Sequence, residues 1–484
     1  MSRPLESAPE SPEAAALALF ANAAAHLDAG ATDAALSCLE QAAALCPDLP
    51  EVHANLGITL DGAGRWAEAE SAYRACLALD PTFDEVHLNL AALCLRQKRL
   101  GEAHAVYLQV LSQDPLSAHA WTGMGVVLAC VHKETEAEMC HRRAVELEPG
   151  HRNARFNLAY LLLRQGRMTE GWEHLEARAW RPGLPGENAP PCWMGQPLSG
   201  KSMLLIAEAG HGDAIHFARG AALLKARGAA RIVLVTQPAL KRVLSTLKDV
   251  DDVVAPEEPL ALNTFDFFAP AMSVPLHCGV TLESIPGQVP YLFAEPANVA
   301  AWSSRLDTLL PERAAPALRV GLVWRGNPKF ENDADRSLPG LPSLAPLWDV
   351  PGVSFVSLQK GAGEDEAGRA DPAQPLLALG PHLHDFADTA AVLAQLDLVI
   401  SVDTAVAHLA GALGRPVWVL LPDYKTDWRW LTERQDSPWY PTVMRLFRQD
   451  STQQWGPTIA RVAEALGRFA ATHPGRGSTA PRPR

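Results

Sequence analysis

A fixed step of 34 residues runs through the first third of the chain and constrains its fold more than any other feature. Three columns of residues keep this step: Pro47, Pro81, Pro115 and Pro149; Ala35, Ala69, Ala103 and Ala137, continued by Gly171; and Glu68, Glu102, Glu136 and Glu170. Chance does not align three columns at one period. A repeat of this length is one supersecondary unit that buries its apolar face by stacking on its neighbours.

Small residues mark where two helices of each repeat approach each other. This column is Gly57, Ala91, Gly125 and Ala159, with Tyr73 and Tyr107 expected to fill the space beside it from the second helix. Each proline follows the expected end of a second helix, which it cannot continue. The pattern resembles the tetratricopeptide repeat. The resemblance implies about five repeats over residues 14–178, after a disordered segment 1–13, and a curved array with a concave binding face.

One polar column stands out within the repeats. Asn55, Asn89 and Asn157 keep the 34-residue step in mid-helix, and Gly123 interrupts them. Asparagine is a mediocre helix former, and its carboxamide both donates and accepts hydrogen bonds. We therefore expect this column to bind an extended peptide backbone, as a similar asparagine ladder does in the eukaryotic O-linked N-acetylglucosamine transferases. The alternative is that these are solvated positions or bonds between repeats.

After Pro191 the pattern changes to short apolar runs separated by polar loops. Strands are expected at Met203–Ala207, Arg231–Val235 and Phe265–Phe268, and then at Arg319–Trp324, Val353–Leu358, Leu396–Val402 and Pro416–Leu421. Helices are expected at Ala214–Arg227 and Thr404–Leu413. This alternation predicts two doubly wound α/β units with parallel strands. Ligands bind such sheets beyond the carboxyl ends of the strands, where this chain concentrates its polar residues.

A phosphate site is predicted where a helix follows the run Leu396–Val402. Asp403 or Thr404 caps this helix, whose free N–H groups and dipole favour an anion. His408 lies one turn further along the same face, within reach of a nucleotide. The alternative is that Asp403 is only a cap and His408 only a packed histidine.

The loops after two neighbouring strands supply further candidate residues for binding the phosphates and base of a nucleotide. Arg325, Asn327 and Lys329 follow one strand, and the two cations can neutralise a diphosphate leaving group. Gln359 and Lys360 follow the next strand, where the amide can pair with a base edge and the ammonium with ribose or phosphate. The alternative for both groups is a solvated polar loop.

The loop after the first strand carries the candidate base. Asp213 lies near the start of a helix, and its carboxylate can take the proton from an attacking hydroxyl. Alternatively, Asp213 only caps that helix. His211, two residues earlier, is a candidate to assist Asp213.

Several stretches together carry a second resemblance. EAGHGDAIHFARG, VGLVWRGNP, FVSLQKG, DTAVAHLAGALG, DWRW and DSPWYP resemble bacterial proteins that join tetratricopeptide repeats to a glycosyltransferase module. That module is similar to the heptosyltransferases of glycosyltransferase family 9 and, more distantly, to the O-linked N-acetylglucosamine transferases of family 41. The resemblance places Gly212 and Asp213 where the family has its base. It places Asp403-Thr404-Ala405 where the family has Asp-Thr-Gly, although Ala405 replaces the glycine. Ala209 and His211 stand where the family more often has Gln and Leu, so the alternative to assistance by His211 is a drifted site.

The resemblance implies the fold and the chemistry. The expected fold class is an α tetratricopeptide-repeat superhelix followed by an α/β GT-B fold with two Rossmann-like domains, residues 200–314 and 315–470, and then a disordered tail, 471–484. The second domain is expected to bind the donor nucleotide. Transfer is expected to be inverting and metal-independent, with a nucleotide sugar as co-substrate and no cofactor. Asp249-Val-Asp251 and Asp333-Ala-Asp335 match the metal triplet of another glycosyltransferase fold, but two carboxylates at this spacing are common by chance.

Composition bears on which partners the protein binds and on the cellular compartment in which it works. Lys+Arg 42 against Asp+Glu 55 gives a net charge of −13, which disfavours a dedicated nucleic-acid binder. No apolar run approaches the roughly 18 residues of a membrane span. The eight cysteines form no Cys-x-x-Cys pair, and the start of the chain lacks a signal-peptide layout, so a reducing cytoplasm is expected.

We therefore predict a cytoplasmic glycosyltransferase that modifies a Ser or Thr hydroxyl of a protein docked on the repeats. Some bacterial proteins of this organisation glycosylate flagellin, which makes flagellin a candidate acceptor. Two alternatives remain. One is a heptosyltransferase-like enzyme for a lipopolysaccharide or lipid-linked acceptor. The other is a non-catalytic repeat scaffold for protein–protein interaction.

Overall fold

A computed structural model describes residues 11–179, 183–184, 186, 189–309, 318–369 and 376–473. The chain divides into two compact units, residues 1–158 and 159–484. The expected disordered tail falls largely outside the described residues, although the last helix ends at Thr472. Of the expected N-terminal segment 1–13, only residues 11–13 are described, and the first helix begins at Pro12.

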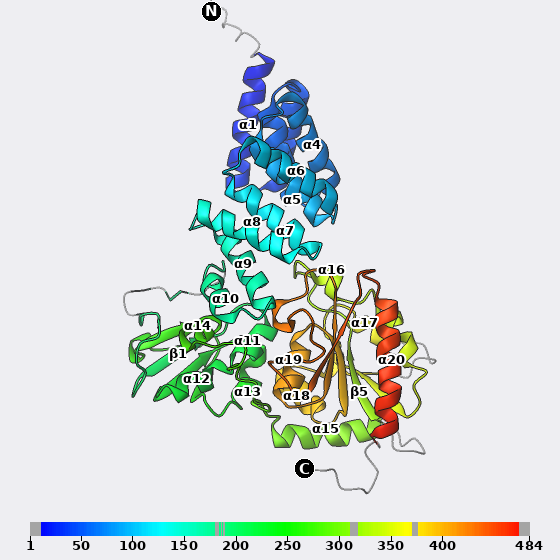
Figure 1. Ribbon diagram of the computed structural model, residues 1–484. Coiled ribbons are helices and arrows are strands. Elements are labelled where there is room, and N and C mark those ends of the chain that lie inside the picture. Colours follow the sequence, from blue (N-terminus) through cyan, green and yellow to red (C-terminus); the bar gives the residue numbers. More distant parts are fainter. Residues whose placement is uncertain are drawn as a thin grey trace, which may run out of the picture. The chain divides into compact units, whose positions relative to one another are not determined.

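The repeat unit is built from antiparallel helix pairs, which confirms the helical repeats (Figure 1). Its helices are α1 (Pro12–Asp28), α2 (Thr32–Leu45), α3 (Pro50–Gly62), α4 (Trp66–Leu79), α5 (Asp84–Arg96), α6 (Leu100–Gln113), α7 (Ala118–Cys130), α8 (Glu134–Leu147) and the start of α9 (Arg152–Arg164). The two helices of each pair pack on each other, and each pair packs on the next through α2 and α3, α4 and α5, or α6 and α7.

Glycines allow the close packing that the small-residue column predicts. A Cβ atom at Gly57 would lie 2.5 Å from the Tyr73 ring, and one at Gly125 would lie 2.5 Å from the His141 ring. Such distances are shorter than any van der Waals contact, so only glycine lets the aromatic ring of the second helix pack against the first helix.

The second unit begins inside α9 and includes α10 (Met168–Leu175), so the predicted end of the repeats at residue 178 lies within it. Trp172 of α10 is buried and donates from its indole N–H to the Val280 carbonyl oxygen at 2.9 Å. Arg178 is also buried and forms a bidentate ion pair with Glu208, at 2.7 and 2.9 Å. These contacts tie α10 and the segment after it to the first sheet.

The first sheet has four parallel strands in the order β3-β2-β1-β4. They are β1 (Ser202–Ile206), β2 (Arg231–Val235), β3 (Asp252–Val254) and β4 (Phe267–Pro270). The three predicted strands are present within two residues of their expected bounds. The sequence analysis missed β3, which is a three-residue edge strand.

The helix expected at Ala214–Arg227 is two helices, α11 (His211–Phe217) and α12 (Gly220–Ala226), so that prediction was wrong. Arg219 lies at the break, and its side chain points back into the protein. It donates to the carbonyl oxygens of His216, Pro286 and Trp439, at 2.9–3.0 Å. A charged guanidinium makes strong hydrogen bonds to these carbonyl oxygens, and these bonds stabilise the break between the two helices.

The second sheet has six parallel strands in the order β10-β9-β8-β5-β6-β7. They are β5 (Leu318–Val323), β6 (Val353–Ser357), β7 (Leu376–Ala378), β8 (Leu398–Val402), β9 (Val417–Leu421) and β10 (Met444–Arg448). The four predicted strands are confirmed. The two missed strands, β7 and β10, are the edges of the sheet, where half-exposed positions weaken the apolar signal.

Helices cover the second sheet and build its core. α20 (Trp455–Thr472) packs beside this sheet with its buried residues Ile459 and Val462 against Leu322 and Ile400 of the strands (Figure 1). The other helices of the unit are α13 (Lys241–Leu244), α14 (Val274–Cys278), α15 (Pro296–Leu309), α16 (Asp333–Arg336), α17 (Glu364–Gly368), α18 (Phe386–Leu393) and α19 (Ala405–Ala412).

Two parallel sheets after a helical repeat array agree with the predicted fold class. No helix within the described ranges is long and apolar enough to cross a membrane. None of the eight cysteines, all of which are described, forms a disulfide.

Candidate functional site

Three polar loops lie side by side because of the order of the second sheet. Strand β5 pairs with β8 on one side and with β6 on the other, and all three are parallel. The loops that follow them therefore leave the same edge of the sheet. Arg325, Gln359 and Asp403, each predicted from a different loop, thus lie at one edge.

The helix α19 begins directly after β8 with an open N-terminus. Thr404 is at the N-cap position but makes no capping hydrogen bond, because its hydroxyl pairs with the Ser401 hydroxyl at 3.0 Å. Among the described residues, the N–H groups of Ala405 and Val406 have no acceptor. An anion at this position would receive hydrogen bonds from these groups and would be favoured by the helix dipole.

The first sheet brings Asp213 to the same place. The N-termini of α11 and α19 pack together, so that a Cβ atom at Gly212 would lie 3.1 Å from His408 Cδ2 and 3.6 Å from Ala405 Cα. A side chain at position 212 would therefore crowd the His408 ring. The predicted base loop and the predicted phosphate loop meet, although they lie about 190 residues apart in the chain.

Arg429 holds the Asp213 carboxylate. Arg429 is only 5% exposed; its Nη2 donates to Asp213 Oδ1, and its Nη1 donates to both carboxylate oxygens of Asp427 at 3.0 Å. Asp213 Oδ2 accepts from the Gly210 N–H at 3.0 Å. Asp213 thus occupies the third position of α11 and caps it, which is the alternative that the sequence left open, and it also belongs to an ion-pair cluster.

Asp403 is the most perturbed acid of the site. Its Oδ2 accepts from the Trp430 indole N–H at 2.9 Å, and its Oδ1 lies 4.0 Å from His408 Nε2. Burial, followed by repulsion from Asp427, raises the pKa of Asp403 to about 6. This carboxyl group can therefore change its protonation near neutral pH, which is a property of functional sites.

His408 lies in an aromatic cluster, so its expected reach to a nucleotide is not supported. It is buried, its ring stacks on Trp430 at 5.2 Å, and Nδ1 lies 3.1 Å from the Tyr440 hydroxyl. Burial and then the cation of Arg429 hold the pKa of His408 well below its usual range. The packed-histidine alternative fits this environment.

Gln359 is used entirely within the protein, so it does not match the expected contact with a base edge. Its Oε1 accepts from the N–H groups of Trp324 and Arg325, both at 3.0 Å. Its Nε2 donates to the carbonyl oxygens of Arg325 and Ala362, at 3.0 and 2.7 Å. These bonds use both amide hydrogens, so Gln359 fixes the Arg325 loop.

The candidate cations differ in how they are paired. Arg325 forms an ion pair with Glu366 at 2.9 Å, and Lys360 lies 2.8 Å from the Gly380 carbonyl oxygen and 3.4 Å from Glu364. Lys329 is exposed, in a turn where Asn327 Oδ1 accepts the Lys329 N–H at 3.1 Å. A donor phosphate would therefore compete with carboxylates for two of the three cations.

The candidate site also contains residues to which the sequence analysis assigned no role. Asp427, Arg429 and Trp430 come from the DWRW stretch, which carried the family resemblance without a role. Tyr160 of α9 lies in the same electrostatic environment: burial, followed by the charge of Asp427, raises its pKa. The sequence feature that could have pointed to Asp427, Arg429 and Trp430 is the unusual concentration of tryptophan next to charged residues in this stretch. Tyr160 has no such feature, because it belongs to the repeat pattern.

His211 and the asparagine column complete the predicted residues. The exposed His211 ring lies 5.1 Å from the Phe386 ring. Asn55, Asn89 and Asn157 are half-buried, and the Asn55 amide donates back to the Glu51 carbonyl oxygen at 2.9 Å. Gly123 interrupts the column because a Cβ atom there would lie 2.1 Å from the Tyr107 ring.

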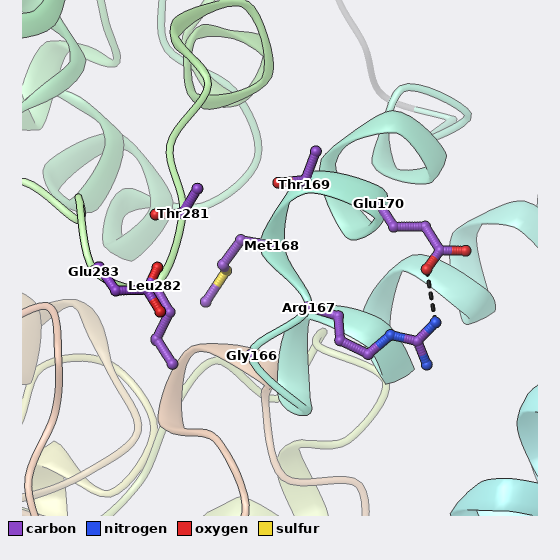
Figure 2. A pocket seen from close by; sticks show the side chains of 8 residues that line it. All are labelled: Gly166, Arg167, Met168, Thr169, Glu170, Thr281, Leu282 and Glu283. Atoms are coloured by element: carbon purple, nitrogen blue, oxygen red, sulfur yellow. Dashed lines mark hydrogen bonds and ion pairs between the residues drawn. The ribbon is translucent and has the colours of Figure 1, made fainter.

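A cavity of about 320 Å³ lies away from these residues (Figure 2). It is lined by Gly166–Glu170, at the turn from α9 to α10, and by Thr281–Glu283. Figure 2 shows Arg167 and Glu170 paired beside it. None of the predicted site residues lines this cavity.

Parts of the chain match two known protein families. Residues 62–125 and 135–182 match the tetratricopeptide repeat, and residues 353–422 match glycosyltransferase family 9 (heptosyltransferase). The family 9 match covers β6 to β9 and therefore includes Gln359, Asp403 and Thr404. These partial matches agree with the expected organisation, in which tetratricopeptide repeats precede a glycosyltransferase module.

Among individual proteins, Protein FlbA of Caulobacter vibrioides (strain ATCC 19089 / CIP 103742 / CB 15) is 31% identical over 370 residues. The alignment covers 70% of this chain and 60% of that protein. Solved structures with similarity include residues 41 to the end of MamA from Desulfovibrio magneticus RS-1, with 22% identity, 33% of this chain, 91% of that chain and a TM-score of 0.31. Pseudomonas aeruginosa PilF has 22% identity, 36% and 80% coverage, and a TM-score of 0.33.

Proposed function

We propose that the protein transfers a sugar from a nucleotide-sugar donor to a Ser or Thr hydroxyl of a protein held by the repeats, with inversion and without a metal ion. Asp213 accepts the proton of the attacking hydroxyl. The open N-terminus of α19, with Thr404, binds the donor phosphates. Transfer develops negative charge on the diphosphate, which fixed N–H donors stabilise without reorganisation.

The observation that carries this proposal is the meeting of the Gly212-Asp213 loop with the N-terminus of α19. A base and an anion site must lie within one sugar of each other for an in-line displacement. Arg325, Lys329 and Lys360 lie in neighbouring loops and supply positive charge for the leaving group. Asn327, which shapes the Lys329 turn, positions one of these cations.

Donor binding is tested first, by thermal unfolding of the protein with UDP, GDP, ADP, CMP and their sugar conjugates. A ligand at about 100 times its dissociation constant adds roughly 2.7 kcal/mol to stability. We expect one nucleotide to raise the midpoint and Thr404→Ala to abolish the rise. If no nucleotide raises the midpoint at millimolar concentration, the non-catalytic scaffold takes precedence.

The role of Asp213 is tested with Asp213→Asn. We expect transfer to fall by at least about 100-fold, the usual contribution of a general base, while donor affinity stays within a few-fold. Asp249→Asn is the matched control, because Asp249 is a half-buried aspartate of the same domain outside the site. Unchanged turnover in Asp213→Asn would remove Asp213 from this role.

The acceptor is tested with the triple variant Asn55→Ala, Asn89→Ala and Asn157→Ala. If the repeats hold a protein such as flagellin, acceptor binding weakens while the nucleotide-induced stabilisation persists. An enzyme acting on a lipopolysaccharide or lipid-linked acceptor would keep its acceptor affinity. We place the reaction in the cytoplasm, in keeping with eight cysteines that form no disulfide.

The scaffold alternative has one observation in its favour. Both oxygens of Asp213 already accept hydrogen bonds, from Gly210 and Arg429. A carboxylate oxygen accepts more than one hydrogen bond, so a hydroxyl can still approach. A variant that removes the competing donor, Arg429→Met, separates the two possibilities: an enzyme changes its pH–rate profile, whereas a scaffold has no rate to change.

A further inference from the structure

Three residues that break the repeat pattern meet in one junction of the repeat unit. His119 stands where other repeats have Glu51, Glu85 and Asn153. Glu148 stands where they have Cys46, Asp80 and Asp114, and His151 where they have Leu49, Phe83 and Ser117. No other repeat has histidine in either histidine column. One ligand atom of each of the three side chains lies within 4.8 Å of the others.

The Glu148 carboxylate is released from the turn that its counterparts cap. Asp80 accepts from the Thr82 N–H and Asp114 from the Leu116 N–H, both at 2.9 Å. Within the described part of the chain, Glu148 makes no such bond. Its extra methylene carries the carboxylate beyond the turn, and it is exposed beside the two histidines.

His151 replaces a serine cap and thereby brings a nitrogen into the junction. Ser117 caps α7 by accepting the Ala120 N–H at 3.3 Å. One repeat later, His151 Nδ1 accepts the Ala154 N–H of α9 at 3.2 Å. His151 is only 6% exposed, and its Nε2 is buried without a hydrogen-bond partner. Buried side-chain nitrogens are normally hydrogen-bonded, and a bound metal ion would give this one a partner.

The neighbouring ring shows where this nitrogen lies. The His119 and His151 rings meet edge to face with their centroids 4.5 Å apart. His119 is exposed at the start of α7, so the junction is open to solvent from its side.

We propose that His119, Glu148 and His151 form a binding site for a divalent transition metal, with Zn²⁺ as the probe. Two imidazole nitrogens and one carboxylate oxygen are a common Zn²⁺ ligand set, and they leave one tetrahedral position for water or for a side chain of a bound partner. The site joins the start of α7 to the turn between α8 and α9. It is independent of the transfer chemistry proposed above.

Binding at Nε2 has a structural consequence. In the neutral ring, Nδ1 accepts from Ala154, so the proton is on Nε2. When Nε2 binds the metal, the proton moves to Nδ1 and the ring remains neutral. The hydrogen bond from Ala154 is then lost, so the metal bond replaces the cap of α9.

The test is a Co²⁺ titration of the full chain after chelator treatment and removal of any histidine tag. We expect one equivalent of Co²⁺ to give the visible absorption of a four-coordinate ion without a thiolate charge-transfer band, and Zn²⁺ to displace it. His119→Ala, Glu148→Gln and His151→Ser should each weaken binding about tenfold or more. His151→Ser restores the cap seen at Ser117, so it removes the ligand while keeping the helix start.

The control is His104→Ala, a half-exposed histidine of α6 outside the junction, which should bind as the unmodified chain does. If Co²⁺ gives no stoichiometric band, or if the three variants bind as tightly as the control, the proposal is wrong. Far-UV circular dichroism shows whether His151→Ser remains folded. If it does not, His119→Ala and Glu148→Gln, which change exposed side chains, decide the outcome.

Discussion

The repeat unit and the α/β unit differ in how far apart in the chain their interacting residues lie. In the repeat unit, side-chain hydrogen bonds join neighbouring repeats, as between Arg96 and Asp61, which are 35 positions apart. In the α/β unit, Arg219 reaches the Trp439 carbonyl oxygen across 220 positions. A repeating step therefore reveals the contacts of the first unit, whereas the site of the second unit is assembled from segments whose pairing has no sequence signal.

The largest expected effect comes from the buried ion pair of the α/β unit. Both side chains of the Arg178–Glu208 pair are fully buried. Arg178→Met leaves the buried Glu208 carboxylate without its cation, with only the Met272 N–H as a donor among the described residues, and should cost about 3–5 kcal/mol of unfolding free energy. Arg167→Met, which removes an exposed pair with Glu170, should cost less than about 1 kcal/mol.

Tryptophan fluorescence during urea unfolding measures this difference, because only Trp66 and Trp121 precede residue 159. Adding Glu208→Leu to Arg178→Met should restore part of the stability, since no charge is then left buried. Equal losses in Arg178→Met and Arg167→Met would show that the pair is not what anchors the segment.

A second effect is the pH dependence that Asp403 gives the α/β unit. The native pKa of about 6 lies above the ordinary aspartate pKa of 3.8, so the native state binds the proton more tightly than the unfolded state. Stability from this group is complete below about pH 4 and is lost as pH rises through 6. The loss amounts to about 3 kcal/mol at 1.36 kcal/mol per pKa unit.

Asp403→Asn removes this dependence while its amide oxygen still accepts from Trp430. The variant should therefore gain stability relative to the unmodified chain as pH rises from 4 to 7, as followed by fluorescence-detected unfolding. His408 is present in both proteins, so its own titration largely cancels. A pH-independent difference would place the Asp403 pKa near its ordinary value.

A smaller effect tests the repeat unit. Gly123→Asn completes the asparagine column but forces a side chain against the Tyr107 ring, 2.1 Å from the added Cβ. Overpacking of this kind costs about 1–3 kcal/mol. Gly62→Ala is the control, because no atom lies within 4 Å of its added Cβ, and it should stabilise by about 0.5–1 kcal/mol. Urea unfolding followed by far-UV circular dichroism separates the two.

The smallest effect has a pH dependence opposite to that of Asp403. A hydrogen bond from Arg99 lowers the pKa of Glu70 in α4 to about 2. The contribution of Glu70 to the free energy of unfolding is complete above pH 4.5 and is lost as pH falls through 2. Because the pair is partly exposed, Arg99→Met should cost only about 1 kcal/mol at pH 7 and less at pH 3. Circular-dichroism melts at both pH values check this, and a larger cost at pH 3 would reverse the assignment.

The sequence predicts most of the fold because local patterns decide it. The 34-residue step identifies the helix pairs, and Gly57 and Gly125 confirm why small residues occupy that column. The apolar runs predict the central strands but miss the short edge strands β3, β7 and β10. The break between α11 and α12 was missed because Arg219 interacts with residues far along the chain.

The site was predicted in part. Asp213 and Asp403 are polar residues that follow strands, and the topology brings them together. Gln359 and His408 already have partners within the protein, which the sequence could not show, because it shows which groups are polar but not which partners already satisfy them. Arg429 could not be assigned, since its two partners, Asp213 and Asp427, are 216 positions and two positions away.

The ion pair between Asp213 and Arg429 can form only late in the synthesis of the chain. A ribosome adds roughly 5–20 residues per second, so about 10–40 s separate the synthesis of these two residues. The repeat helices α1 to α8 have been synthesised before either residue is made. The repeat helices of a nascent chain are thus complete well before its last third supplies Arg429 to the ion pair with Asp213.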